Sequence, residues 1–172
     1  MVQNNKLSGD YIAGFVDGEG CFALKFRRDV RKDRSGNPEY FYWDIEFDIV
    51  LKADDKEILE KIGSALNCGT ITIDKRGMAR YSVSNTNDLF NKVVPFFERY
   101  RLHAKKRYDF ELWREAVNIF HRNQNGGGIR KSQKNSWRKE DVKMLIKLQE
   151  KMKAYKGGNR HNWKWMHKSS SY

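Results

Sequence analysis

Residues 11–20 have the sequence YIAGFVDGEG, and this segment is the most informative part of the chain. We expect a short helix here, because Ser8 can act as an N-cap and Asp10 lies in the first turn, where the helix dipole favours an acid. Asp17 and Glu19 fall in the last turn, where the dipole disfavours a carboxylate by about 0.3–1 kcal/mol. We therefore expect a cationic group near this end of the helix.

One side of the predicted helix is almost bare. Gly14 and Gly18 lie one turn apart, with Ala13 beside them, and small residues at this spacing let another helix approach closely. That arrangement is best known from membranes, but the chain has no apolar run long enough to span one, so we expect the partner helix in an aqueous interface. Gly20 is expected to end the helix as a left-handed cap. An amphipathic helix whose acids lie near a solvated loop would explain the same spacing.

The segment resembles the defining motif of the LAGLIDADG homing endonucleases. The matching positions are Ala13, Gly14, Asp17, Gly18 and Gly20, with conservative changes at Ile12, Phe15, Val16 and Glu19. In that family the motif helices of two subunits or two domains pack against each other, and the last acid of each motif binds a catalytic divalent metal ion.

The resemblance implies roles for individual residues. Glu19 corresponds to the catalytic, metal-binding carboxylate, and the carbonyl of Gly18 to a further metal ligand. Asp17 corresponds to the first acid of the motif, which we interpret as structural support. Contacts between two copies would involve Ala13, Gly14, Asp17 and Gly18. Oxygen ligands suit Mg²⁺, for which Mn²⁺ or Ca²⁺ can stand in, and Mg²⁺ keeps water molecules that include a nucleophile candidate.

The charge of the chain indicates an anionic partner. Its 172 residues include 34 basic and 22 acidic ones, giving a net charge of +12 and a pI near 9.7. Nucleic acid is the first candidate. A membrane surface suits the chain less well, because it has no basic amphipathic helix and no long apolar run. The histidines lack zinc-site spacing and no GxxxxGK phosphate loop occurs, which argues against a zinc nuclease and an ATPase.

The two cysteines indicate a reducing compartment. Cys21 and Cys68 lack the spacing of a metal site, so we expect them to pack as small apolar residues. No signal or transit peptide is recognisable in residues 1–6.

After residue 20 the apolar residues repeat at every second position, which is typical of β-strands. Strands over 22–27 and 40–51 are expected to form a long hairpin, and two shorter strands follow at 70–73 and 79–84. The residues predicted to face inward are Phe22, Leu24, Phe26, Phe41, Trp43, Ile45, Phe47, Ile49, Leu51, Ile71, Ile73, Tyr81 and Val83.

Further helices are expected between and after the strands. Asp54 predicts a capping box after the hairpin, and Asn87 predicts the N-cap of a helix that Pro95 interrupts or restarts. Longer helices are expected over 104–121 and 139–154. The order predicts an α+β fold with a four-stranded antiparallel, saddle-like sheet and helices on one face, which is also the fold that the resemblance implies.

The chain is expected to form one domain over residues 1–155, followed by a basic tail over 156–172. Residues 123–135 are polar and glycine-rich and should form an exposed loop. Basic residues of the loop and the tail could contact DNA, and a solvated loop with a partly disordered tail is the alternative.

The outward face of the predicted sheet carries side chains that donate and accept hydrogen bonds. They are Lys25, Arg27, Tyr40, Tyr42, Asp44, Glu46, Thr70, Thr72, Arg80 and Ser82. Such side chains have partners on base edges in the major groove, which admits a two-stranded ribbon. A solvated sheet face would show the same alternation, but the family that the chain resembles binds DNA with this sheet, which favours a DNA-binding surface.

The resemblance adds two more site predictions. Residues 101–110 resemble the segment before the last core helix of the family, where a lysine approaches the active site. Lys106 is the first candidate and Lys105 the alternative, while phosphate contact or plain solvation would also explain them. The family often has a polar residue, frequently glutamine, at the end of the second strand near the metal ions. No glutamine matches here, and the candidates are Asp48, Leu51 and Lys52, of which we favour Asp48.

Together these features predict a site-specific, divalent-metal-dependent DNA endonuclease. Phosphodiester hydrolysis needs an in-line water and charge relief on the phosphoryl oxygens, which paired divalent ions supply. The chain has one copy of the motif, so we expect a homodimer about the motif helix and a roughly palindromic site. The resemblance implies staggered double-strand cleavage of a long site in intron homing. The alternatives are an intron RNA-binding splicing cofactor (maturase) and an inactive DNA-binding protein of the same fold.

Overall fold

The computed structural model describes residues 6–30, 32–33, 35–36, 39–123 and 137–156. Its elements in chain order are α1 (Gly9–Glu19), β1 (Gly20–Val30), β2 (Glu39–Lys52), the 3₁₀-helix η1 (Ala53–Asp55), α2 (Lys56–Leu66), β3 (Thr70–Ile73), β4 (Met78–Val83), α3 (Thr86–Asp88), the π-helix η2 (Leu89–Val93), α4 (Val94–Arg99), α5 (Lys106–Asn123) and α6 (Lys139–Lys156). The predicted order of helices and strands is confirmed. Predictions for residues 124–136 and for the tail beyond Lys156 lie outside the described residues.

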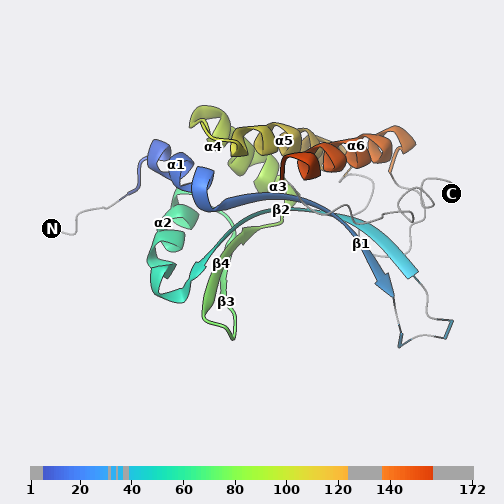
Figure 1. The fold of residues 1–172 in the computed structure, drawn as a ribbon, viewed down its shortest axis with the longest axis horizontal. Coiled ribbons are helices and arrows are strands. Elements are labelled where there is room, and N and C mark those ends of the chain that lie inside the picture. The colour runs from blue at the N-terminus through green and yellow to red at the C-terminus, as the bar shows by residue number, and fades with distance from the viewer. Residues whose placement is uncertain (1–5, 31, 34, 37–38, 124–136, 157–172) are drawn as a thin grey trace.

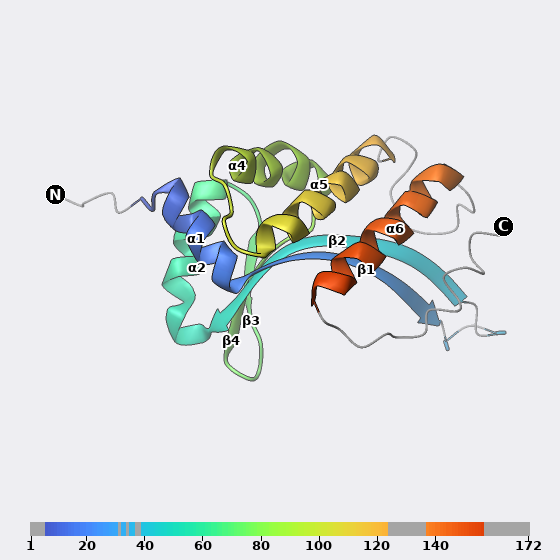
Figure 2. The same cartoon turned by 45° about the horizontal axis from the view of Figure 1, so that its top comes forward.

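The four strands form one antiparallel sheet in the order β1-β2-β4-β3. β1 and β2 make the predicted long hairpin, in which Phe22 lies opposite Phe47, and β4 pairs with β2 so that Ser82 lies opposite Asp48. The sheet is curved like a saddle, with α4, α5 and α6 on its convex side (Figure 1), and its concave side carries no described helix. In the turned view α5 and α6 run next to each other above β1 and β2 (Figure 2). The predicted α+β architecture is therefore confirmed.

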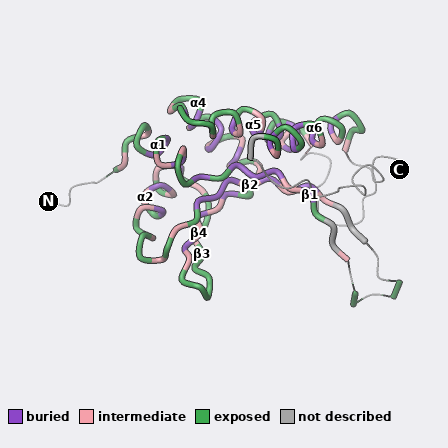
Figure 3. The backbone as a smooth tube through the Cα atoms, in the orientation of Figure 1, coloured by how far each residue is buried: buried purple, intermediate pink, exposed green. Residues whose placement is uncertain are grey.

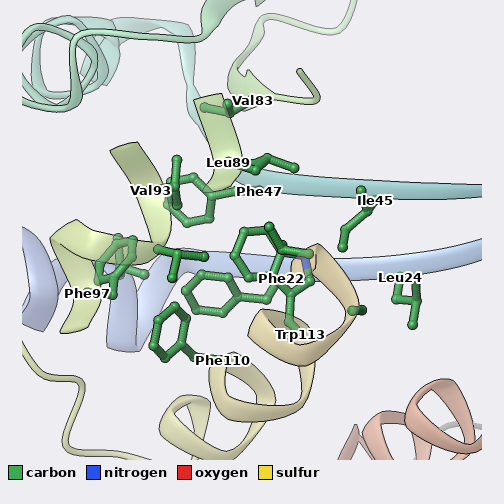
Figure 4. Close-up of a cluster of buried hydrophobic side chains, with 14 of the residues drawn as sticks. Phe22, Leu24, Ile45, Phe47, Val83, Leu89, Val93, Phe97, Phe110 and Trp113 are labelled. Carbon is green, nitrogen blue, oxygen red and sulfur yellow. The ribbon is translucent and has the colours of Figure 1, made fainter. Parts of the chain in front are cut away.

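The core lies between the sheet and the helices and is rich in aromatic rings. Phe22 of β1 packs on Phe47, Phe97 and Trp113, with ring centroids 5.2, 5.6 and 5.0 Å away (Figure 4). Such pairs add about 0.5–1.5 kcal/mol each to the burial of apolar surface. The middle of β1 and β2 is buried (Figure 3), and Phe22, Leu24, Phe26, Trp43, Ile45, Phe47 and Ile49 are in the core, as their period of two predicts. The alternation sends the remaining side chains to the concave side.

α6 packs on α5 and on the edge strand β1. Leu145, Leu148 and Met152, which lie three or four residues apart on one face of the helix, are buried. Gln149 is buried too, and its Nε2 donates to the carbonyl oxygen of Leu24 at 3.1 Å, which helps to satisfy the backbone of the edge strand. Among the described residues, no helix is both long enough and apolar enough to cross a membrane.

Asp141 joins the start of α6 to the end of α5. Its carboxylate forms an ion pair with Arg122 and accepts a hydrogen bond from Nδ2 of Asn123 at 2.8 Å. Burial of Asp141 opposes its ionisation, but the hydrogen bonds from Arg122 and Asn123 outweigh burial and hold the pKa of the carboxyl below its ordinary value. The charge of Asp141 therefore stabilises the contact between the two helices.

Some local predictions are wrong. Asp54 lies in the 3₁₀-helix, and Asp55 occupies the N-cap of α2 without a side-chain hydrogen bond, so the capping box is absent. The later N-cap is Asn85, whose side chain accepts from the backbone N–H of Asn87 at 2.9 Å. Ile73 is exposed, because β3 is a short strand at the sheet edge.

Candidate functional site

The end of α1 presents an acid without a partner. Glu19 is exposed in the last turn and makes no hydrogen bond or ion pair with any described residue. The predicted cation comes from another part of the chain: the ammonium group of Lys106, the first residue of α5, donates to the carbonyl oxygen of Gly20. A positive charge is thus held next to the negative end of the helix, where it is stabilising.

The structure distinguishes the two candidate lysines. Lys106 is half-buried and contacts the start of β1, as the resemblance implies. Lys105 is exposed and makes no such contact, although it immediately precedes α5. Of the two lysines, only Lys106 therefore contacts the residue that follows Glu19.

Asp17 links α1 to the segment before α5. Its Oδ2 accepts hydrogen bonds from the backbone N–H groups of His103 and Ala104, at 2.6 and 3.1 Å. Its Oδ1 is buried and has no hydrogen-bond partner among the described residues. The prediction that Asp17 supports the structure is confirmed. The Asp17 carboxylate is thus engaged within the chain, with backbone groups that end two residues before Lys106, and its contact with a second copy stays a prediction.

The exposed side of α1 is as bare as the sequence predicts. Gly14 and Gly18 are exposed, and a Cβ atom built on either would meet no atom within 4 Å. Tyr11 stands on the same helix with 51% of its surface exposed. Ala13 is different: it is only 2% exposed and packs in the core, because it follows Ile12 on the inner face of the helix. The prediction that Ala13 offers an interface to a second copy is therefore wrong.

Gly20 does not end the helix in the predicted way. Its φ and ψ are −74° and 160°, an extended conformation, so no left-handed cap is formed and β1 starts directly after Glu19. A glycine is still needed here, because a Cβ atom would lie 2.5 Å from Cγ1 and 2.9 Å from the carbonyl oxygen of Val16. Close packing, and not a left-handed backbone, explains this glycine.

The concave face of the sheet carries the predicted polar side chains. Those that the structure describes are all exposed or half-buried: Lys25, Arg27, Tyr42, Asp44, Glu46, Thr70, Thr72, Arg80 and Ser82. The side chain of Tyr40 lies outside the described residues. Their predicted outward direction is confirmed.

Many of these side chains are joined in ion pairs across strands. Lys25 of β1 lies 3.1 Å from the carboxylate of Glu46 on β2, and Arg27 forms an ion pair with Asp44. Arg80 of β4 reaches the same carboxylate of Glu46 at 2.9 Å. The face is therefore an ordered network of donors and acceptors.

Asp48 has a different environment from the one predicted. It is buried, and both of its oxygens accept from Arg80: Nε donates to Oδ1 and Nη2 to Oδ2, each at 2.9 Å. Burial raises the pKa of the Asp48 carboxyl above its ordinary value, although the hydrogen bond from Arg80 acts in the opposite direction. A carboxylate engaged in this way does not suit the assistance of a metal-bound water, so the catalytic role predicted for Asp48 is corrected.

The cysteines are not both packed in the interior. Cys21 is exposed on the concave side of β1, opposite Asp48, so the prediction that it packs as an apolar residue is wrong. Cys68 is half-buried, with its sulfur 3.9 Å from the hydroxyl of Tyr81. Burial raises the pKa of the Cys68 thiol.

The concave face of the sheet and the acid at the end of α1 have a chemistry that suits particular ligands. A curved antiparallel sheet with hydrogen-bonding side chains can lie in the major groove of a duplex. The carboxylate oxygen of Glu19 is the ligand type that hard divalent cations prefer. Within the described parts of the chain, no three His, Cys, Asp or Glu side chains gather in a way that could hold a metal ion. The fold is thus a curved sheet with a hydrogen-bonding face, joined to a first helix that ends in an exposed acid, an arrangement suited to nucleic acid.

The chain belongs to the LAGLIDADG endonuclease family, because the model of that family matches residues 12–117. Two curated fungal relatives are named as intron-encoded. "Probable intron-encoded DNA endonuclease 1" of Mycosarcoma maydis is 31% identical over 109 residues, which cover 63% of this chain and 37% of the relative. "Probable intron-encoded endonuclease 2" of Neurospora crassa is 30% identical over 118 residues, which cover 66% of this chain and 24% of the relative. The chain therefore spans well under half the length of these relatives.

Solved structures share the fold. The homing endonuclease I-TnaI has a TM-score of 0.69 at 23% identity, over 96% of this chain and 97% of that chain. I-SmaMI bound to uncleaved DNA in the presence of calcium ions has a TM-score of 0.64 at 28% identity, over 87% of this chain and 46% of that chain. The predicted LAGLIDADG fold is therefore confirmed.

Proposed function

We propose that this protein is a divalent-metal-dependent DNA endonuclease that acts as a homodimer. It makes staggered double-strand breaks at a long, roughly palindromic site in intron homing. The observation that carries the proposal is the end of α1, where the carboxylate of Glu19 has no partner among the described residues and follows the bare side of the helix directly. The names of the relatives support the intron setting, and the DNA-bound state of I-SmaMI supports the substrate.

The assembly follows from the exposed side of α1. Gly14 and Gly18 leave room for a second backbone, and Tyr11 supplies apolar surface beside them. Two copies related by a twofold axis along this side would bring their Glu19 residues close to the axis, one for each DNA strand. The match to 46% of the I-SmaMI chain supports an assembly of two such units.

The residues at this place fit a hard divalent cation. Glu19 has an exposed carboxylate with no competing partner in the described chain. The carbonyl of Gly18 is among the last four of the helix, which lack intrahelical donors, so it is available as a second oxygen ligand. Mg²⁺ accepts a small number of protein carboxylates because it retains several waters. When bound, such ions supply charge relief on phosphoryl oxygens and a more acidic water.

Lys106 supplies a fixed positive charge beside the acid. Its ammonium group is held by the carbonyl oxygen of Gly20, the residue after Glu19. A preorganised cation at this place would stabilise the negative charge that develops on the phosphoryl group during cleavage. Lys105, which is exposed, would contact the DNA backbone instead.

The hairpin of β1 and β2 has a length that suits a long target. β2 contains 14 residues, which extend over about 45 Å at about 3.3 Å per residue. A duplex of that length contains roughly 13 base pairs. Two copies related by a twofold axis would therefore span more than about 20 base pairs and prefer a site with matching half-sites.

The test is a cleavage assay on a plasmid that carries the fused exons flanking the gene. The proteins compared are the wild type, Glu19→Gln and the matched control Glu115→Gln, which changes an exposed glutamate on α5. Each is incubated with Mg²⁺ or with EDTA, and DNA binding is measured in parallel. We expect linear DNA with staggered ends only in Mg²⁺, for the wild type and the control. Glu19→Gln should bind DNA and leave it uncut.

Two results would contradict the proposal. Cleavage by Glu19→Gln at the wild-type rate would show that the carboxylate of Glu19 takes no part in the reaction. Binding of the folded intron RNA, with no cleavage of the fused exons in any divalent metal, would favour the splicing-cofactor alternative.

A further inference from the structure

Arg80 is held in place on the concave face by two acids. Its Nε and Nη2 both donate to Asp48 at 2.9 Å, and Nη2 also lies 2.9 Å from the carboxylate of Glu46. Lys25 binds the same oxygen of Glu46 at 3.1 Å. The remaining terminal nitrogen, Nη1, takes part in none of these contacts. As far as the described residues show, its N–H groups are therefore available to a ligand.

The two acids are more deeply buried than the arginine that they hold. The side chain of Asp48 is 8% exposed and that of Glu46 is 15% exposed, whereas Arg80 is 41% exposed. The acids are therefore covered while the guanidinium stays accessible on the concave face. An arginine loses considerable rotamer freedom when it binds a ligand, and a planar fork that is already oriented loses less. Arg80 is thus preorganised for recognition.

Three basic side chains at the centre of this face are paired with acids. Lys25, Arg27 and Arg80 each form an ion pair with an acid of β2, and these acids are Asp44, Glu46 and Asp48. Three positive side chains paired with three negative ones add little net attraction for phosphate. Its hydrogen-bonding groups are better suited to base edges, which carry no charge. Arg80 is the residue with free donors at the centre of this arrangement.

We propose that Arg80 recognises guanine in each half-site and that Asp48 is a positioning residue that holds Arg80 for this contact. The inference rests on the proposed function. In the major groove, guanine presents two acceptors, N7 and O6, whereas adenine presents one acceptor and one donor. Nη1 can donate hydrogen bonds but cannot accept them, so it matches the acceptor edge of guanine better than the mixed edge of adenine. In the sheet Asp48 lies opposite Cys21, and Cys21 is only two residues after Glu19. The recognised guanine therefore lies in the inner part of the half-site, next to the cleavage position.

The experiment is a selection of bound duplexes from a fully randomised DNA library, which requires no knowledge of the target. The base preference at every position is compared for the wild type, Arg80→Lys and Asp48→Asn. Arg80→Lys keeps a positive charge between the two acids, so the protein remains folded, but it removes Nη1 and therefore the donors that are left for a base. Arg114→Lys is the matched control, because Arg114 forms an ion pair with Glu98 in the helical layer, at 3.0 Å.

We expect the wild type to select guanine at one inner position of each half-site. Arg80→Lys should lower that preference about 5- to 150-fold and leave the other positions unchanged. Asp48→Asn should lower the preference at the same position, by a smaller factor. Arg114→Lys should give the wild-type profile.

Three results would overturn the inference. An unchanged profile for Arg80→Lys would exclude Arg80 from recognition. Asp48→Asn with an unchanged profile but slower cleavage of every target would place Asp48 in the reaction instead. A wild type that selects no sequence at all would contradict the proposed function itself, so the two failures give different results.

Discussion

The substitution Gly14→Ala tests whether the bare side of α1 is an interface between two copies. In one chain a Cβ atom at Gly14 meets nothing within 4 Å. Alanine should therefore stabilise a lone chain by about 0.5–1 kcal/mol, because it loses less backbone entropy than glycine in a helix. In the proposed dimer the added methyl group lies between two helices and occurs twice about the twofold axis. Overpacking of this kind costs about 1–3 kcal/mol, which would weaken the dimer about 5- to 150-fold.

The two effects are measured separately. Sedimentation equilibrium over a range of concentrations gives the dissociation constant of the dimer. Urea denaturation at concentrations below that constant gives the free energy of unfolding of the monomer. Asn118→Ala is the matched control, because it raises helix propensity by about 0.5 kcal/mol at an exposed position of α5 and leaves α1 unchanged. It should stabilise the chain and leave dimerisation unaffected.

One outcome would refute this reasoning. If Gly14→Ala stabilises the protein at every concentration and leaves the dissociation constant unchanged, α1 does not form the interface. The Glu19 carboxylates of two copies would then not meet near a twofold axis, and the assembly that we propose for cleavage would be wrong.

Three further substitutions test other contacts. Lys106→Met should slow single-turnover cleavage about 10²-fold or more while DNA affinity changes little, because it removes a fixed cation beside the acid; an equal loss of binding would contradict this. Asp17→Ala should lower the free energy of unfolding in urea by about 1–3 kcal/mol, because two backbone N–H groups lose their acceptor; Asp17→Asn should lower it less, and no loss for alanine would show that the link is unimportant. Asp141 has a lowered pKa, so its charge stabilises the fold above the ordinary carboxyl pKa, and this contribution is lost as the pH falls through the lowered pKa. Asp141→Asn should therefore cost about 1–2 kcal/mol near neutral pH, and the gap to the wild type in thermal unfolding should close in acid. A gap that stays constant down to about pH 2 would contradict that assignment.

The sheet and the core could be predicted from the sequence because their signals are local. The alternation from Phe22 to Phe26 and from Trp43 to Ile49 specifies which face of each strand is buried, and it does so without knowledge of the partner strand. The first residues of the helices were harder to predict, because two residues close together in the sequence can both be suitable N-caps. Asn85 and Asn87 are equally good caps by type, and the end of β4 at Val83 decides between them.

The site was only partly predictable, because several of its contacts join residues that are far apart in the sequence. The motif resemblance led to Glu19 and Lys106, and in the structure the ammonium group of Lys106 donates to the carbonyl oxygen of Gly20, the residue after Glu19. The pairing of Arg80 with Asp48 joins residues 32 positions apart and depends on the placement of β4 beside β2, which no local pattern encodes. The burial of Ala13 likewise depends on how α1 is turned against the core, which spacing alone does not fix.

The direct passage from α1 to β1 has a consequence for target selection. Glu19 ends the helix and Gly20 starts the strand, so the subunit has no hinge between the helix that would meet its copy and the ribbon that would meet DNA. β1, with 11 residues, then acts as a lever of about 35 Å. Tilting the paired helices by about 10° would swing its far end by about 6 Å, nearly two base-pair steps. Substitutions along α1 should therefore alter the preferred distance between half-sites without touching any side chain that contacts a base.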